Sequence, residues 1–463
     1  MKVFQPVRPR FRRIGITGSS LTGKTVFLLS LINHLESGDL DVSTNRNKPG
    51  SIPYFKKLDL SRDKKKIEFP YDEFRKHLAA GHWPRRTTDQ WFYRCRFRRP
   101  NHGIIEWDEV EFFDFPGERL ADVLMFDADY ATWSDRLWSL LKSDPKKADR
   151  AAEFLRLAES SEPKLEELTV AYKGALAALI LDCQPLVSPS TFLLDEHGVR
   201  ARGETIDKIL AGRVAGLEKA EFAPLPAAAR ASFSALESEF AKRYCGYKKA
   251  VVEPFQRHLL ECHQLVYLID VADILASGPM KLNDTKQMIG ELFRCLEPSR
   301  NIMRRFGRGV FNFVASAVGK HWSCIERIAF VASQVDRVHR DDREKLSGLV
   351  KQLVGNHRKN NGFDAAAVGF SYCSAARSTQ SVVGRRFLKG RPTHEFRNGK
   401  PQSLPLVGDP LELEVPELPE RWPTQWSAEA YSGFTHFHPE VPAVHDQPPD
   451  QIGLDEIMRF LLK

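Results

Sequence analysis

Eight consecutive residues near the start of the chain have the types and spacing of a phosphate-binding loop. They fit the pattern Gly-x-x-x-x-Gly-Lys-Ser/Thr at every fixed position, and they are Gly18, Ser19, Ser20, Leu21, Thr22, Gly23, Lys24 and Thr25. A short apolar stretch at 13–17 precedes the loop, and from Val26 onward apolar residues recur at helical spacing. In a strand–loop–helix unit of this kind, backbone N–H groups and the helix N-terminus cradle phosphate oxygens.

Three residues of this segment carry the predicted chemistry. Lys24 is expected to reach the β- and γ-phosphates, the Thr25 hydroxyl to bind Mg²⁺, and Val26 to contact the nucleotide. The alternative is a glycine turn before an ordinary helix, with a chance lysine. Because a predicted strand and a predicted helix flank the loop in the required order, the sequence favours a nucleoside triphosphate site.

A second motif, Asp-Phe-Pro-Gly-Glu at 114–118, ends a strand predicted over 104–113. An acidic residue at the end of a buried strand suits Mg²⁺, so Asp114 is the predicted metal ligand. Gly117 has no side chain, and its N–H could approach the γ-phosphate and sense its loss. Glu118 is the predicted water-positioning residue, and its negative charge beside the phosphates predicts slow turnover. An ordinary strand–turn junction is the alternative.

The segment between these motifs predicts the rest of the metal site. Alternation over 90–98 indicates a strand that would pair with 104–113 as an antiparallel hairpin, an arrangement that resembles the Ras-like GTPase class. Such proteins place a threonine just before the first hairpin strand, where it completes the Mg²⁺ shell. Thr87 and Thr88 both occupy that place, and a solvated polar turn is the alternative. Arg86 could act as an arginine finger in cis, or it could belong to a solvated basic corner.

Two later strands predict the base-binding residues. The strand over 327–332 ends in Ser-Gln-Val-Asp, where GTPases read guanine with Asn-Lys-x-Asp. Asp336 is present to accept hydrogen bonds from guanine, whereas Gln334 replaces the usual lysine. The strand over 367–373 leads into a loop that resembles the Ser-Ala-Lys contact to guanine O6. The predicted contact residues there are Ser374, Ala375 and Ala376. Together these pieces favour guanine over adenine.

Four segments of the chain also match the pattern of one known family. They are the phosphate loop followed by Val-Phe, the Trp-Pro-x-Arg-Thr segment at 83–87, the Asp-Phe-Pro-Gly-Glu-Arg run at 114–119 and the Arg-Tyr … Tyr-Lys segment at 243–248. Over nearly its whole length the chain resembles the bacterial YcjX family of phosphate-loop GTPases. The resemblance implies an association with the envelope-stress response, a partner at the inner membrane, and nucleotide contacts at Lys24, Thr25, Asp114 and Gly117. Gln334 departs from the lysine that relatives often keep.

The composition is ordinary for a soluble globular protein, with 42% hydrophobic and 28% charged residues. No apolar run approaches the roughly 18 residues needed to span a bilayer, and no apolar signal core opens the chain. Seven cysteines without Cys-x-x-Cys pairs predict free thiols in a reducing cytoplasm. We therefore expect a cytoplasmic protein, with peripheral attachment at the inner membrane as an open alternative.

The formal net charge of +8 raises nucleic acid and anionic membranes as partners. Solvated basic faces of this size are common, and the chain lacks the aromatic–basic interleaving of an RNA platform, so nucleic acid is disfavoured. A polybasic N-terminal segment without a lipid anchor would contact anionic membranes only weakly.

The motif positions predict the organisation of the chain. The fold class is α/β: a Ras-like phosphate-loop core with a mostly parallel sheet flanked by helices, a large α-helical insertion domain and a small C-terminal β element. The predicted segments are 1–118 as the first part of the core with an insertion at about 36–82, 119–258 as the helical insertion, 259–390 as the second part of the core, and 391–463 as an irregular β segment with a terminal helix.

The expected function is Mg²⁺-dependent binding of GTP and its slow hydrolysis to GDP and phosphate, used as a conformational switch. Two alternatives stay open at this level. One is an ATPase with the same phosphate site, which the altered base motif favours. The other is a nucleotide-gated interaction protein that barely turns over.

Overall fold

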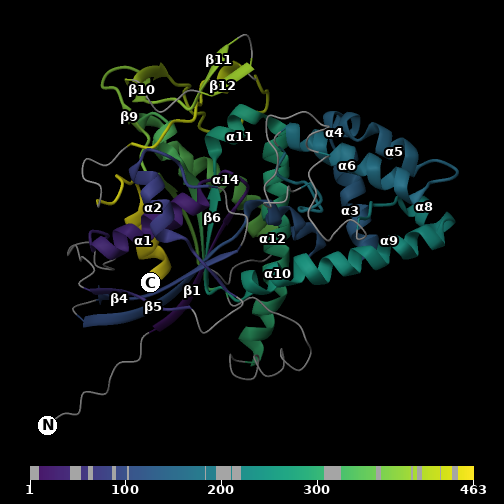
Figure 1. Cartoon of the computed structure of the whole chain (residues 1–463), viewed down its shortest axis with the longest axis horizontal. Helices are drawn as coiled ribbons and strands as arrows, with labels where there is room; N and C mark the ends of the chain where they lie inside the picture. The colour runs from purple at the N-terminus through teal and green to yellow at the C-terminus, as the bar shows by residue number, and fades with distance from the viewer. Residues whose placement is uncertain are drawn as a thin grey trace. The chain divides into compact units, whose positions relative to one another are not determined.

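In the computed structural model of the chain, two sets of segments each pack around a core of their own (Figure 1). Unit 1 consists of Met1–Phe115, Cys262–Gly278 and Cys324–Lys463, and unit 2 of Pro116–Glu261 and Pro279–Ser323. The structure describes residues 10–41, 54–60, 66–85, 90–101, 104–182, 184–193, 210, 221–306, 325–360, 367–397, 400–403, 409–427, 429–440 and 447–463.

Eight strands form the central sheet of unit 1: β1 (Arg10–Gly18), β2 (Tyr54–Lys57), β3 (Ile67–Glu68), β4 (Trp91–Asn101), β5 (Ile104–Asp114), β6 (Gln264–Ile269), β7 (Arg327–Ser333) and β8 (Ala367–Cys373). Their order is β2-β4-β5-β1-β6-β7-β8, with β3 beside β4. The strands from β5 to β8 in this order pair in parallel, and β4 pairs antiparallel with β5. The predicted mostly parallel sheet and the predicted hairpin are therefore both confirmed.

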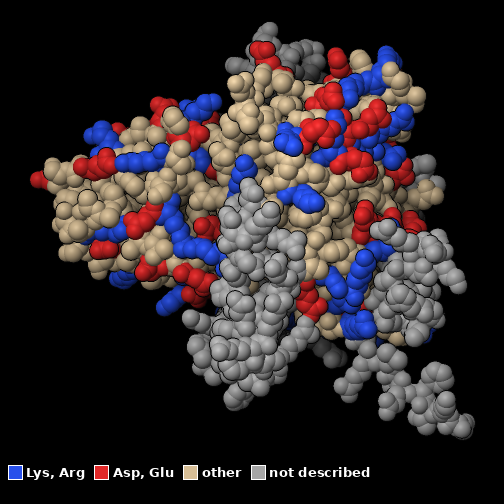
Figure 2. Space-filling model, turned by 180° about the vertical axis from the view of Figure 1, so that it is seen from behind, with Lys and Arg blue, Asp and Glu red and all other residues tan. Residues whose placement is uncertain are grey.

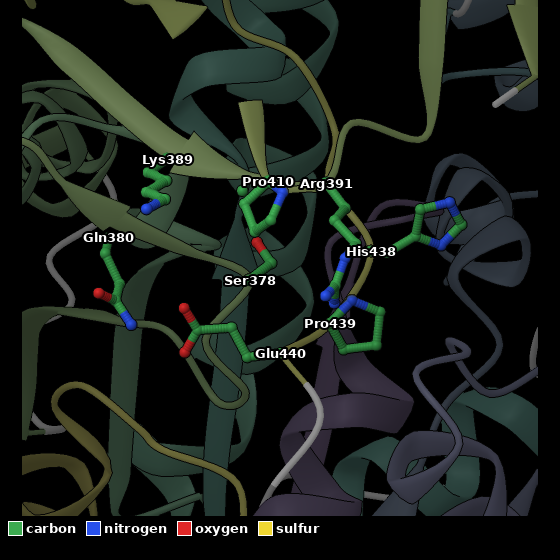
Figure 3. A pocket seen from close by; sticks show the side chains of 9 residues that line it. Ser378, Gln380, Lys389, Arg391, Pro410, His438, Pro439 and Glu440 are labelled. Carbon is green, nitrogen blue, oxygen red and sulfur yellow. The ribbon is translucent and has the colours of Figure 1, made fainter. Parts of the chain in front are cut away.

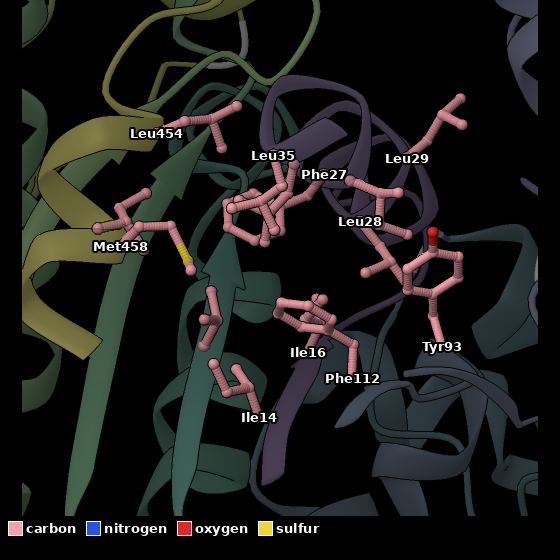
Figure 4. Close-up of a cluster of buried hydrophobic side chains, with 14 of the residues drawn as sticks. Ile14, Ile16, Phe27, Leu28, Leu29, Leu35, Tyr93, Phe112, Leu454 and Met458 are labelled. Atoms are coloured by element: carbon pink, nitrogen blue, oxygen red, sulfur yellow. The ribbon is translucent and has the colours of Figure 1, made fainter. Parts of the chain in front are cut away.

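Five helices of unit 1 accompany this sheet: α1 (Lys24–Ser37), α2 (Tyr71–Ala79), α11 (Val271–Ser277), α14 (Arg343–Asn360) and α15 (Leu454–Leu462). Ile14 and Ile16 of β1 join Phe27 and Leu35 of α1 and Met458 of α15 in one buried cluster (Figure 4). Burying a large apolar side chain of this kind contributes about 1.5–3 kcal/mol. The cluster thus fixes the start of α1, which carries the phosphate loop, against the sheet.

The segment assigned to an insertion at about 36–82 contributes to this same sheet and core. β2 pairs antiparallel with β4, and β3 pairs with β4 in parallel. Phe74 and Leu78 of α2 are buried in the cluster that holds α1. The extra length therefore adds two strands and a helix to the core of unit 1.

Between β8 and α15 the chain forms two small β structures. One is a three-stranded sheet of β9 (Thr379–Ser381), β10 (Phe387–Gly390) and β13 (Leu411–Glu414), and the other is a hairpin of β11 (His394–Arg397) and β12 (Lys400–Ser403). The predicted β element and the predicted terminal helix are both present. The small sheet starts at Thr379, before the predicted boundary at 391.

Two arginines of the β4–β5 hairpin share an acidic partner. Arg94 and Arg96 both donate hydrogen bonds to Glu109 across the hairpin, and Arg12 of β1 pairs with the fully buried Asp108 at 3.2 Å. Figure 2 shows blue and red side chains interspersed over the visible face. Part of the positive charge on this side of the sheet is thus balanced by acidic residues within the fold.

Unit 2 is helical, in agreement with the predicted insertion. Its elements are the 3₁₀-helix η1 (Gly117–Met125), α3 (Tyr130–Lys142), α4 (Pro145–Arg150), α5 (Ala152–Ala158), α6 (Leu165–Leu181), α8 (Ala227–Ser232), α9 (Ser234–Tyr247), the π-helix η2 (Lys248–Val252), α10 (Glu253–Leu260) and α12 (Pro279–Phe306). The residues of α12, placed in the core by the sequence division, belong to this unit. Across the described residues, no helix is both long and apolar enough to cross a bilayer.

A buried polar cluster ties η1 to the rest of unit 2. The carboxylate of Asp122 accepts hydrogen bonds from the Ser190 N–H at 2.9 Å, the Ser188 hydroxyl at 3.1 Å and the Tyr247 hydroxyl at 2.8 Å. Burial raises the pKa of Asp122, while these donors favour its charged form. The segment that follows the Asp-Phe-Pro-Gly motif is thereby anchored to the helical unit.

Candidate nucleotide-binding site

The phosphate loop connects β1 to α1, and its backbone needs glycine at two points. Gly18 has φ 143°, and a Cβ there would lie 2.4 Å from the carbonyl oxygen of Leu268. Gly23 has φ 85° and is the N-cap of α1. Leu21 adopts φ 67° without being glycine, a conformation that costs free energy and must be held by its surroundings.

The Lys24 side chain folds over this loop. Its Nζ donates to the carbonyl oxygen of Ser19 at 2.8 Å, and the Thr22 hydroxyl donates to the same oxygen at 3.0 Å. Lys24 is only 5% exposed. Its charge therefore lies at the start of α1, where the first N–H groups and the helix dipole already favour an anion. Ser20 lies in the turn of the loop, and Val26 follows in the first turn of α1.

The structure brings together the two predicted metal ligands that lie in described residues. The Thr25 hydroxyl, in the first turn of α1, donates to Oδ2 of Asp114 at 3.0 Å, and Asp114 at the end of β5 is fully buried. A hydroxyl and one carboxylate are the hard oxygen donors that suit Mg²⁺, which is commonly held by one or two carboxylates, waters and substrate phosphates. The donor set at this position fits a nucleotide-bound Mg²⁺.

The other residues predicted to act on the γ-phosphate are not among the described residues of unit 1. Arg86, Thr87 and Thr88 lie outside the described residues. Gly117 and Glu118 open η1 and belong to unit 2.

The base motif follows β7, as predicted, and it contacts the phosphate loop. Gln334 adopts φ 55°, and its amide Nε2 donates to the carbonyl oxygen of Leu21 at 2.7 Å. Asp336 is 3% exposed, and its Oδ2 accepts hydrogen bonds from the N–H of Ser378 at 2.8 Å and from the Ser378 hydroxyl. The carboxylate expected to read the base is therefore held in one orientation.

The predicted loop Ser374–Ala376 lies beside α1 and α15. Ser374 pairs through its backbone with Ile452, and the carbonyl oxygen of Ala375 accepts a hydrogen bond from the hydroxyl of Ser30 in α1. The serine that binds Asp336 is Ser378, which sequence reasoning missed. The sequence offers one signal for Ser378, the run of polar residues at 377–380 that follows Ala376.

A cavity of about 210 Å³ lies beside the same loop (Figure 3). Its lining includes Ser378 and the polar side chains of Gln380, Lys389 and Glu440. Burial raises the pKa of Glu440. Because Ser378 also binds Asp336, one wall of this cavity is the loop that orients the predicted base-reading carboxylate.

A phosphate loop after the central strand, a buried aspartate at the end of the neighbouring parallel strand and the observed strand order define a phosphate-loop α/β protein with a Ras-like core. The chain belongs to the YcjX-like family, DUF463, whose model matches residues 12–463. The resemblance inferred from the motifs is thereby confirmed.

Two relatives are similar to the chain over nearly its whole length, and both are named Ras-like GTPase YcjX. The one from Escherichia coli (strain K12) is 24% identical, and the match covers 98% of this chain and 95% of the relative. The one from Shewanella oneidensis (strain ATCC 700550 / JCM 31522 / CIP 106686 / LMG 19005 / NCIMB 14063 / MR-1) is also 24% identical, over 98% of this chain and 94% of the relative.

Proposed function

We propose that this protein binds guanine nucleotides together with Mg²⁺ and hydrolyses GTP slowly to GDP and phosphate, acting as a conformational switch. The observation that carries the proposal is the contact between the Thr25 hydroxyl and Asp114 at 3.0 Å, beside a lysine held over a phosphate loop. The names of both relatives support GTP as the nucleotide.

In this proposal the phosphate chain lies along the loop at the N-terminus of α1. The backbone N–H groups of the loop would donate to its oxygens, and Lys24 would exchange its contact with the Ser19 carbonyl for the β- and γ-phosphates. Thr25 and Asp114 would hold Mg²⁺ directly or through water. Mg²⁺ would neutralise charge that develops between the two terminal phosphates. Thr87 or Thr88 would complete the metal shell.

Guanine would be read at the end of β7. Ser378 donates a hydrogen bond to Oδ2 of Asp336 and so fixes the plane of the carboxylate. The other oxygen of Asp336, Oδ1, could then accept a hydrogen bond from the base. The loop Ser374–Ala376 would lie at the opposite edge of the base, where the backbone N–H groups of Ala375 and Ala376 would donate to guanine O6. Gln334 in place of lysine would contribute by holding the phosphate loop.

Positioning and electrostatics would account for the hydrolysis, since phosphoryl transfer requires little covalent chemistry from the protein. Glu118 would orient the attacking water, and Arg86 would stabilise charge in the transition state. Gly117 would report the γ-phosphate. A carboxylate beside the phosphates opposes the build-up of negative charge, and for this reason we expect slow turnover.

The test is titration of nucleotide-free protein with fluorescent GTP, GDP and ATP in Mg²⁺, alongside Asp336→Ala. We expect a guanine preference of at least about tenfold that the substitution abolishes, since unmet hydrogen bonds to the base cost about 1.4 kcal/mol or more. Equal binding of ATP by both proteins would overturn the guanine assignment and favour an ATPase.

A second candidate is a nucleotide-gated interaction protein with negligible turnover, and the carboxylate at Glu118 favours it. Phosphate release under single-turnover conditions separates the two functions. Tight GTP binding without release of phosphate would support the second candidate. The envelope-stress role and the inner-membrane partner rest on the family resemblance alone and stay predictions.

A further inference from the structure

Arg337 directly follows the predicted base-reading aspartate, and its guanidinium is buried at 3% exposure. Its Nη1 pairs with Oδ2 of Asp270 at 2.7 Å. Asp270, 4% exposed, caps α11 with its other carboxylate oxygen, which accepts from the Asp273 N–H at 2.9 Å. A guanidinium held this deeply needs acceptors for all of its donors, so its position is determined by the groups around it.

The guanidinium of Arg337 also reaches three acceptors outside the α11 cap. Nε and Nη2 donate to the carbonyl oxygens of Thr435 and Phe434, both at 3.1 Å, and Nη1 also lies 3.4 Å from Oε1 of Gln334. One side chain thus joins the end of β6, the base motif and a segment near the C-terminus.

Arg337 and the Leu21 carbonyl, on opposite sides of the Gln334 amide, together fix which way that amide points. Arginine can only donate, so the amide oxygen of Gln334 has to face Arg337, and the amide NH₂ is thereby directed at the Leu21 carbonyl. Leu21 is the one residue of the phosphate loop that holds a positive φ without being glycine. The hydrogen bond from Gln334 at 2.7 Å is therefore placed where the loop needs support.

Residues 434–440, here called the strap, connect this network to two further parts of the site. The carbonyl oxygen of Phe437 accepts from the Trp83 indole N–H at 2.8 Å, close in sequence to the predicted switch threonines. The N–H of Glu440 donates to the carbonyl oxygen of Arg377 at 3.0 Å, next to Ser378. Within unit 1 the strap thus contacts Arg337 directly after the base motif, Arg377 beside the loop Ser374–Ala376, and Trp83.

We propose that Arg337 is a positioning residue for the nucleotide site. The strap carbonyls hold Arg337, Arg337 orients the amide of Gln334, and the hydrogen bond from Gln334 then holds the phosphate loop at Leu21 in its binding conformation. This inference rests on the proposed nucleotide binding. Arg337 would not touch the nucleotide, and its effect would appear as slower dissociation of bound nucleotide.

The test is a double-mutant cycle on Arg337→Lys and Gln334→Ala, read out as the dissociation rate of fluorescent GDP from the full chain in Mg²⁺. Lysine keeps a charge for Asp270 but cannot reach the two carbonyls and Gln334 together. We expect each single variant to release GDP about tenfold faster, and the double variant to be no faster than Arg337→Lys, because coupled residues are non-additive. Additive effects, or no effect at Gln334, would overturn the proposal.

Gln334→Glu gives a second test that does not disturb the buried arginine. Its carboxylate can still accept from Arg337 but cannot donate to Leu21, so GDP should dissociate faster while the unfolding temperature is maintained. Dissociation at the wild-type rate would contradict the proposal.

The matched control is Trp422→Phe. Like the variants at Arg337 and Gln334, it removes a hydrogen bond from a side chain to a backbone carbonyl. The bond lost runs from the Trp422 indole N–H to the Leu349 carbonyl at 2.9 Å. Its GDP dissociation rate should equal that of the wild type. A wild type that binds no guanine nucleotide would overturn the proposed function as well, whereas normal binding with unaffected variants would overturn the role of Arg337 alone.

Discussion

The proposed metal site depends most directly on the carboxylate of Asp114. This carboxylate is fully buried, it accepts from Thr25, and it lies at the end of a strand adjacent to β1. Asp114→Asn preserves the shape and an acceptor for Thr25 but removes the charge. We expect the strengthening of nucleotide binding by Mg²⁺ to fall at least about tenfold, or about 1.4 kcal/mol. The measurement compares the nucleotide Kd in Mg²⁺ with the Kd in EDTA.

The matched control for this substitution is Asp108→Asn on the same strand. Asp108 is also fully buried, but it pairs with Arg12 at 3.2 Å, away from the phosphate loop. Asp108→Asn should lower the free energy of unfolding and leave the ratio of the Kd in Mg²⁺ to the Kd in EDTA unchanged. If Asp114→Asn also left this ratio unchanged, Mg²⁺ would not be bound by Asp114.

Among the elements, α14 begins directly after Asp342, a buried carboxylate that also binds the C-terminal region. Asp342 accepts from Lys345 at 3.0 Å, from the Leu418 N–H at 3.2 Å and from Arg386. Burial alone would raise its pKa, but the hydrogen bonds from Lys345 and Arg386 outweigh it and hold the pKa of Asp342 below its usual value. A carboxylate whose pKa is lowered by folding stabilises the fold at pH values above its pKa in the unfolded chain, about 3.9. This contribution is lost as the pH falls through the lower pKa of the folded state.

Asp342→Asn should therefore lower the free energy of unfolding by about 1.5–3 kcal/mol near neutral pH, because hydrogen bonds to a charged group are lost. The difference from the wild type should shrink as pH falls below about 4. Denaturant unfolding at a series of pH values measures it. The exposed neighbour Asp341→Asn is the control, with a change within about 0.5 kcal/mol. A difference that stays constant down to pH 2 would exclude this charge as its source.

The elements also separate what the sequence could predict from what it could not. Local pattern predicted β1, the phosphate loop and α1, and the alternation over 90–98 predicted the hairpin of β4 and β5, since strand and helix periodicities are local signals. The hydrogen bond from Gln334 to Leu21 joins residues 313 positions apart. Ser378 acquires Asp336 as a partner across 42 positions, and Arg337 acquires the carbonyl groups of Phe434 and Thr435 across about a hundred. No local signal encodes such contacts.

At the scale of the whole molecule, the chain passes from unit 1 into unit 2 within the motif proposed to sense the γ-phosphate. Unit 1 includes Asp114 and Phe115, and unit 2 begins at Pro116. Gly117 then opens η1, a 3₁₀-helix of nine residues. Runs of this kind longer than three or four residues are uncommon because their hydrogen-bond geometry is poorer, so η1 is a segment whose conformation a ligand could change.

We therefore expect amide hydrogen exchange in η1 to slow about tenfold when GDP is replaced by a non-hydrolysable GTP analogue, because an N–H at Gly117 would be engaged by the γ-phosphate. Amides of α15, which is buried against the sheet of unit 1, should exchange equally with both nucleotides. Asp114→Asn should abolish the difference in η1, since the metal that orders the γ-phosphate would be lost. If η1 exchanged equally with both nucleotides while their affinities were intact, the protein would bind nucleotide without using it as a switch, because no signal would pass from the phosphate site into the helical unit.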